Sequence, residues 1–250
     1  MFGRRAPPAP PSYAHDDTLE VAGCVVRLKV DRRARRVSLR IDAARREVIA
    51  TAPSPRRLQD AAAFAAQRAQ WIGRAVGRLP DAAPFEPGGV IELLDRPCRL
   101  EAAPGRRGQG LVDDENGLRL VAFGDGAAFT RSAVRLLKAE ALKVLAERSA
   151  VHAAALGRPL PTVAVTDARS RWGSCTPGRG MKPGSVRYSW RLILAPYAVM
   201  DYVAAHECGH LVHADHSPRF WDVVKGLVGE VKTQRAWLRA HGPRLHAAGR

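Results

Sequence analysis

The chain has 250 residues, 46% of them hydrophobic, so it can bury a sizeable core and has a globular rather than a disordered composition. Forty lysines and arginines against 24 aspartates and glutamates give a formal net charge of +16. This excess favours polyanionic partners such as nucleic acid or nucleotides, with a solvated basic surface as the alternative. No run of eighteen apolar residues occurs, so no membrane span is expected.

Residues 1–17 are rich in proline and lack the apolar stretch of a secretory signal. We therefore expect a disordered tail on a cytoplasmic protein. The four cysteines lie far apart and form no CxxC pair, which argues against a zinc ribbon or a disulfide framework.

Residues 18–125 are predicted to form a β-rich N-terminal half. Apolar and polar residues alternate over 18–52 in the manner of strands with one buried face. Further short strands are expected over 80–125, where Asn116-Gly117 is typical of a hairpin turn.

One long helix is predicted within this half, over 55–79. Ser54-Pro55 is a typical helix start, because proline at the first helical position loses no needed N–H. The helix should bury one apolar seam, which consists of Leu58, Ala62, Ala65, Ala69, Ile72, Val76 and Leu79.

The second half, residues 126–240, is predicted to mix helices with a small sheet, which makes the whole chain α+β. A long helix is expected over 131–156, and strands over 162–165 and 184–194. The intervening loop, 169–183, would give a cleft a positive rim through Arg169, Arg171, Arg179 and Lys182. Residues 241–250 are predicted to be a frayed basic tail.

The most informative stretch is His206-Glu207-Cys208-Gly209-His210, an HExxH string. On a helix that begins near Pro196, the two histidines share one face and lie about 6 Å apart along the axis. Both imidazoles then reach one zinc ion, while Glu207, roughly 100° around the helix, is placed to act on a metal-bound water.

A catalytic zinc usually has three protein ligands and one open position. His216 is the predicted third ligand, because Ser217-Pro218 starts a new helix directly after it and Trp221 can pack back against it. His213 is the competitor, but three ligands in a row on one straight helix cannot converge on one ion. We assign His213 to a supporting or substrate-side position.

Four segments together resemble the YgjP-like zinc metallopeptidase domain family, which is similar to the SprT-like and WLM zincins. They are Ser170–Cys175, Ser189–Pro196, His206–His210 and His216–Trp221, and the similarity extends from about residue 20 to 240. The resemblance implies a zincin-type fold in the C-terminal half, with the HExxH helix beside a small sheet. It also implies His206, His210 and His216 as zinc ligands and Glu207 as general base.

We therefore expect a zinc metallopeptidase in which Glu207 accepts a proton from a zinc-activated water. A further group should stabilise the oxyanion, and the candidates are Arg171, Tyr188, Tyr202, His213 and Arg219. Two alternatives stay open. The same water could hydrolyse nucleotide phosphoanhydrides, or the chain could be a non-catalytic nucleic-acid-binding module with a structural zinc.

Overall fold

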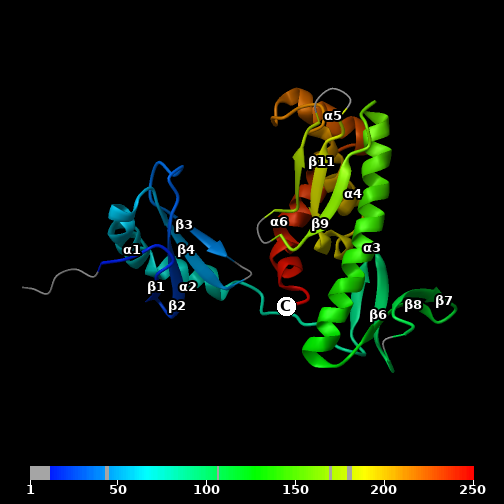
Figure 1. Ribbon diagram of the computed structural model, residues 1–250, viewed down its shortest axis with the longest axis horizontal. Helices are drawn as coiled ribbons and strands as arrows, with labels where there is room; N and C mark the ends of the chain where they lie inside the picture. The colour runs from blue at the N-terminus through cyan, green and yellow to red at the C-terminus, as the bar shows by residue number, and fades with distance from the viewer. Residues whose placement is uncertain (1–11, 43–44, 106, 169–170, 179–181) are drawn as a thin grey trace, which may run out of the picture. The chain divides into compact units, whose positions relative to one another are not determined.

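The computed structural model describes residues 12–42, 45–105, 107–168, 171–178 and 182–250. Contacts divide the chain into two compact units, residues 1–79 and 80–250 (Figure 1). The described residues form three small mixed sheets and six α-helices, which confirms the predicted mixed α+β class. None of those helices has both the length and the apolar character that a membrane crossing requires.

The first unit contains one four-stranded sheet in the order β1-β2-β4-β3. Its strands are β1 (Thr18–Val21), β2 (Cys24–Val30), β3 (Ser38–Asp42) and β4 (Glu47–Ala52). The central pair, β2 and β4, is parallel, and both outer pairs are antiparallel. Part of the predicted disordered tail, residues 1–11, lies outside the described residues, but Asp16 and Asp17 exchange backbone hydrogen bonds with Leu28 and extend this sheet.

The helix predicted over 55–79 is present as three segments, η1 (Pro55–Arg57), α1 (Leu58–Gln67) and α2 (Ala69–Gly77). The interruption falls at Arg68, whose φ and ψ of −101° and 17° lie outside the helical range. The predicted seam nevertheless faces the sheet, and Leu58, Ala65 and Ile72 are at most 1% exposed. These side chains form the core of the unit with strands β2 and β4.

The second unit begins with a sheet in the order β5-β6-β8-β7, with the same sequence of antiparallel, parallel and antiparallel pairs. The strands are β5 (Val90–Leu93), β6 (Arg96–Ala103), β7 (Gly110–Asp114) and β8 (Gly117–Phe123), so the hairpin predicted at Asn116-Gly117 is present. The sequence predicts these strands as part of the β-rich N-terminal half, residues 18–125. They instead pack against the second half, because Leu100 and Leu120 share a core with helix α3 (Gly126–Ala155).

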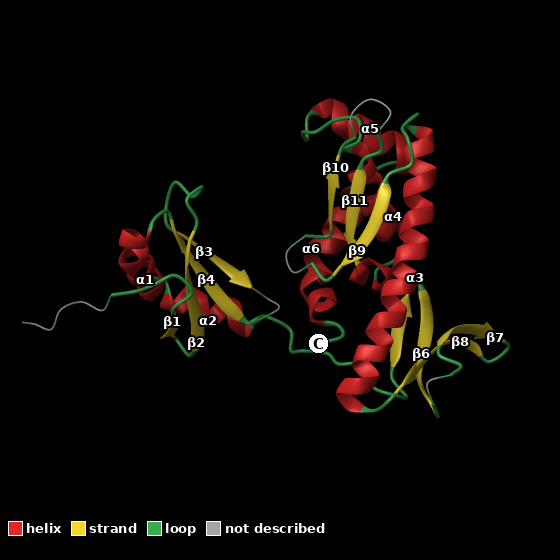
Figure 2. Ribbon diagram, in the orientation of Figure 1, coloured by secondary structure: helices red, strands yellow, loops and turns green. Residues whose placement is uncertain are grey.

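Helix α3 (Gly126–Ala155) runs beside both sheets of this unit (Figure 2). The second sheet has the order β10-β11-β9 and contains β9 (Thr162–Thr166), β10 (Gly173–Thr176) and β11 (Ser185–Ser189). Strand β10 falls within the stretch predicted as a loop. The predicted strand 184–194 ends at Ser189 and continues as the buried 3₁₀ helix η2 (Trp190–Leu194).

Three helices complete the second unit: α4 (Tyr197–Gly209), α5 (Pro218–Val228) and α6 (Lys232–Ala247). The predicted frayed tail is wrong for residues 241–247, which continue α6. His246 stacks on Trp172 with ring centroids 4.3 Å apart, and Leu245 is 8% exposed. The Gly249 N–H then donates to the Ala83 carbonyl, so this end of the chain is anchored to the core.

Candidate metal centre

Helix α4 carries His206 and Glu207 in its last turn. It begins one residue later than the sequence suggests, with Pro196 at the cap position, and ends at Gly209 with His210 as its C-cap. The His210 N–H donates to the Glu207 carbonyl three residues back, which tightens the final turn. Helix α4 therefore stops before His213, which does not continue the stripe of His206 and His210.

Helix α5 begins as predicted, with Ser217 as its cap and Pro218 at the first helical position. His216 immediately precedes this start. Trp221 lies against it with ring centroids 5.9 Å apart, which confirms the predicted contact across the helix start. The position of His216 is therefore determined by the packing of α5.

The structure brings the three predicted ligands, His206, His210 and His216, together. One ring nitrogen from each lies within 4.8 Å of the others, and the Nε2 atoms of His206 and His216 are 3.2 Å apart. Two nitrogens bound tetrahedrally at about 2.0–2.1 Å from zinc would be separated by roughly 3.3 Å. The observed spacing fits a zinc ion shared between these imidazoles.

Phe220 packs against the rings of all three histidines. Its ring centroid lies 4.9 Å from that of His206, 4.5 Å from His210 and 4.9 Å from His216, and the residue is 0% exposed. A Cβ at Gly209 would come within 3.0 Å of the Phe220 ring, so glycine at this position allows α5 to approach α4. The histidines are thus held by packing as well as by their own helices.

The hydrogen bonds of the rings decide which nitrogen is free. The Nδ1–H of His210 donates to the His213 carbonyl at 2.9 Å, which leaves Nε2 as the ring nitrogen with a free lone pair. His213 thus contacts the His210 ring through its backbone carbonyl, and the role of its side chain stays a prediction. Burial, with repulsion from the neighbouring histidines, lowers the pKa of His206 to about 4 and favours the neutral, ligating form.

Glu207 is 6% exposed and lies against the first residue of strand β10. A Cβ at Gly173 would sit 2.5 Å from the Glu207 Cγ and Oε1 atoms, so only glycine leaves room for this carboxyl. Burial raises the pKa of Glu207 to about 7, and the positive charge of Arg171 acts in the opposite direction. A carboxyl with this pKa is suited to accept and return a proton near neutral pH.

The candidates for the oxyanion donor differ in burial and in their distance from the histidines. Tyr188 is an incorrect candidate for the oxyanion donor, because its buried hydroxyl bonds Ser149 at 2.9 Å inside the core. Tyr202 remains a candidate, since its ring centroid lies 6.0 Å from that of His206. Arg171 is exposed and electrostatically coupled to Glu207, and Arg219 is exposed on α5.

Helix α4 is fixed to α3 by a partly buried polar network. The Asp201 carboxylate accepts a hydrogen bond from Arg148 at 2.7 Å and pairs with the His152 ring at 2.7 Å. These contacts lower the pKa of Asp201 despite the opposing effect of burial. Cys208 faces the same helix, with its sulfur 3.7 Å from the Ser149 carbonyl, and so points away from the histidines as expected.

Arg235 of α6 is a neighbour of the histidines that the sequence interpretation missed. Its guanidinium lies 4.7 Å from the centre of the Trp221 ring, and its charge contributes to the lowered pKa of His206. No local motif marks Arg235, because it approaches the site only through the packing of α6 beside α4.

A mixed α+β domain with three convergent imidazoles beside a buried carboxylate is the arrangement typical of metallohydrolases. Comparison with known families agrees with this class. The chain belongs to the YgjP-like metallopeptidase domain family, which matches residues 35–241. No curated protein and no solved structure matches the chain.

Proposed function

We propose that this protein is a zinc-dependent metallopeptidase in which His206, His210 and His216 hold the metal and Glu207 is the general base. The observation that supports it best is the convergence of the three ring nitrogens within 4.8 Å, next to a carboxyl that is 6% exposed. The cluster comprises three protein ligands among the described residues, as a catalytic site requires, whereas a structural zinc is expected to have four.

Each residue of the candidate site has a separate role in the proposed hydrolysis. Zinc held by the three imidazoles would supply Lewis acidity and lower the pKa of a bound water toward about 7. Glu207 accepts the proton of the attacking water and delivers it to the leaving amine. The His213 carbonyl keeps the His210 ring in its ligating orientation, and Tyr202 or Arg171 stabilises the developing negative charge on the carbonyl oxygen.

Strand β10 offers a site for an extended peptide, because it is an edge strand packed beside α4. The Ser189 N–H of β11 donates to the carbonyl of Trp172, the residue just before β10, at 2.8 Å. Trp172 and Ser189 are therefore a hydrogen-bonded pair of the antiparallel ladder. Bonded pairs alternate in an antiparallel ladder, so the backbone groups of Gly173 and Cys175 point to the open edge. A peptide paired there would pass directly beside Glu207.

The decisive experiment combines Glu207→Gln with metal removal. Wild-type protein with one zinc per chain should cleave casein or fluorogenic peptides, and a chelator should abolish cleavage until zinc is restored. Glu207→Gln should keep its zinc and lose about 10²- to 10⁴-fold in kcat. Glu86→Gln, an exposed position in the same unit, is the matched control and should keep full activity. A fully active Glu207→Gln protein would refute the proposal.

One observation favours a second candidate, hydrolysis of nucleotide phosphoanhydrides. A cavity of about 390 Å³ adjoins Trp221 and is lined by four cationic side chains, Lys225, Lys232, Arg235 and Arg239. Lys225 is paired with Glu230 at 2.8 Å, which leaves three cations to attract phosphates. Nucleoside triphosphates tested beside the peptides, with and without chelator, would separate the two activities.

A further inference from the structure

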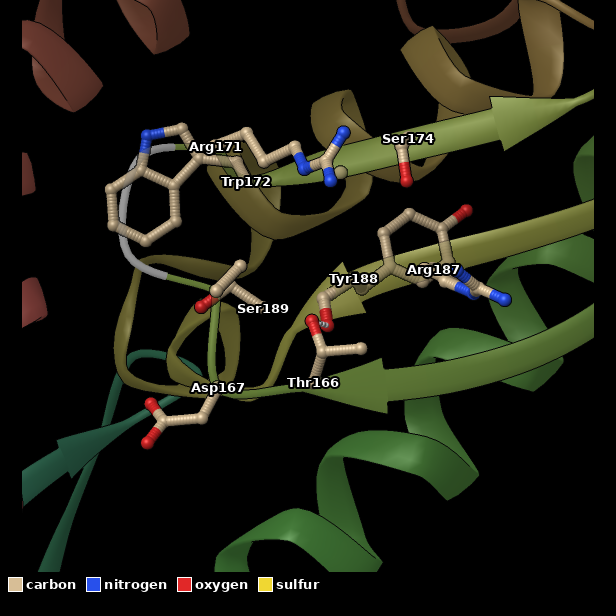
Figure 3. Close-up of a pocket in the computed structure, with 10 residues that line it drawn as sticks. Thr166, Asp167, Arg171, Trp172, Ser174, Arg187, Tyr188 and Ser189 are labelled. Carbon is tan, nitrogen blue, oxygen red and sulfur yellow. Dashed lines mark hydrogen bonds between the residues drawn. The ribbon is translucent and has the colours of Figure 1, made fainter. Parts of the chain in front are cut away.

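The face of the β10-β11-β9 sheet that points away from α4 carries a second cavity, of about 320 Å³ (Figure 3). Its size lies within the range of about 300–1,000 Å³ that is common for small-molecule sites. Side chains alternate between the two faces of a strand. Because Tyr188 faces the core, its neighbours Arg187 and Ser189 on β11, and Ser174 opposite Arg187 on β10, belong to the outer face.

This cavity is directly connected to the candidate metal centre through Gly173. The backbone of Gly173 lines the cavity, while its missing side chain leaves room for the Glu207 carboxyl. Arg171, which also lines the cavity, is close enough to Glu207 to affect its pKa. A peptide on the β10 edge would therefore send alternate side chains toward this face.

Two arginines, Arg171 and Arg187, contribute positive charge to the described lining of the cavity. Figure 3 shows the Ser174 hydroxyl between the guanidinium groups of Arg171 and Arg187 in this view. Within the described part of the chain neither arginine forms an ion pair. Asp167, the one carboxylate among the described lining residues, is already paired with Arg191 and lies near Arg250.

A further polar group in the cavity has no partner. Ser189 is 0% exposed, and its Oγ forms no hydrogen bond with any described residue. A buried hydroxyl without a partner costs about 1–3 kcal/mol, so this end of the lining carries an unsatisfied polar atom. Nearer the strand centre, Ser174 lies opposite Arg187, and its hydroxyl together with the two arginines provides donors for a carboxylate.

We propose that this cavity binds a carboxylate of the substrate, and so makes the site selective for acidic peptides. The inference rests on the proposed peptidase function and names its substrate class. Strands are spaced about 4.8 Å apart, so a peptide on β10 lies two spacings from Arg187, and an acidic side chain on the outer face meets the arginine across Ser174. The carboxylate is either that of a glutamate or aspartate side chain or the peptide's own C-terminus.

The test uses extended peptides that differ only in carrying Glu, Gln or Lys at one scanned position, each with a free or amidated C-terminus. Dissociation constants are measured by fluorescence anisotropy on zinc-loaded Glu207→Gln protein, and kcat/KM on the wild type. The carboxylate peptide should bind about 10-fold more tightly than its neutral counterpart. The Glu/Gln pair reports a side-chain carboxylate, and the acid/amide pair reports the C-terminus.

Arg187→Gln should reduce that ratio to about 1, whereas Arg99→Gln, an exposed strand arginine on the other sheet of the unit, should leave it unchanged. Ratios near 1 for both peptide pairs, or a ratio that persists in Arg187→Gln, would overturn the inference. If no peptide is cleaved in a zinc-dependent manner, the proposed function fails, but the binding ratios still report on the cavity.

Discussion

Gly173→Ala is the substitution that most directly tests the contact between strand β10 and the proposed base. The added Cβ would meet the Glu207 Cγ and Oε1 at 2.5 Å, and ordinary contact begins near 3.4 Å, so the carboxyl must move by about 0.9 Å (3.4 − 2.5). The atoms it meets, from Cγ outward, belong to a side chain that can rotate about its own bonds. The helix and strand can therefore stay in place while the base moves.

A displacement of about 1 Å at a reacting group costs about 10²-fold in rate. This corresponds to about 2.7 kcal/mol of lost transition-state stabilisation, at 1.36 kcal/mol for each factor of ten. We expect Gly173→Ala to lower kcat by about that factor while zinc content stays at one per chain. Steady-state cleavage of a fluorogenic peptide, metal analysis and thermal unfolding measure the three quantities.

The matched control is Gly226→Ala in α5, where an added Cβ meets nothing within 4 Å. That substitution should leave kcat unchanged and stabilise the protein by up to about 1 kcal/mol, since alanine is favoured over glycine inside a helix. Wild-type kcat in Gly173→Ala would show that Glu207 does not act from the position described.

The other predictions concern packing, metal and pH. Phe220→Ala should cost about 3–5 kcal/mol of unfolding free energy and weaken zinc binding, because the ring supports all three histidines; unchanged zinc affinity in a competition assay would contradict this. His216→Ala should lose zinc but keep its far-ultraviolet circular dichroism, since residue 216 is exposed; retained stoichiometric zinc would exclude it as a ligand. The pKa of Asp201 is lowered in the folded protein. Its pairing therefore stabilises the fold fully at pH values above 3.8, its ordinary pKa, and this stabilisation is lost as the pH falls through the lower pKa of the folded state. Urea unfolding between pH 2 and 5 should therefore show a shallower acid slope in Asp201→Asn, and an identical slope would contradict the assignment.

Much of the candidate site was predictable from short-range patterns. The HExxH string, the Ser217-Pro218 helix start and the contact of Trp221 with His216 depend on residues a few positions apart, where helix periodicity and capping act directly. The seam from Leu58 to Val76 was predictable for the same reason, even though the helix breaks at Arg68.

The tertiary structure decided the features that depend on distant neighbours. Strand β10, Gly-Ser-Cys-Thr, consists of small residues at a sheet edge, so it shows no apolar alternation. The need for glycine at Gly173 arises from Glu207, 34 positions away (207 − 173). The residues around Tyr188 in the sequence do not indicate whether its hydroxyl lies in the cleft or, as observed, against Ser149. Sequence alone determined which side chains can hold a metal and move a proton, because those are properties of residue type and helical spacing. Only the packing of α4, α5 and β10 determined their surroundings, because burial and close contact are set by elements far apart in the chain.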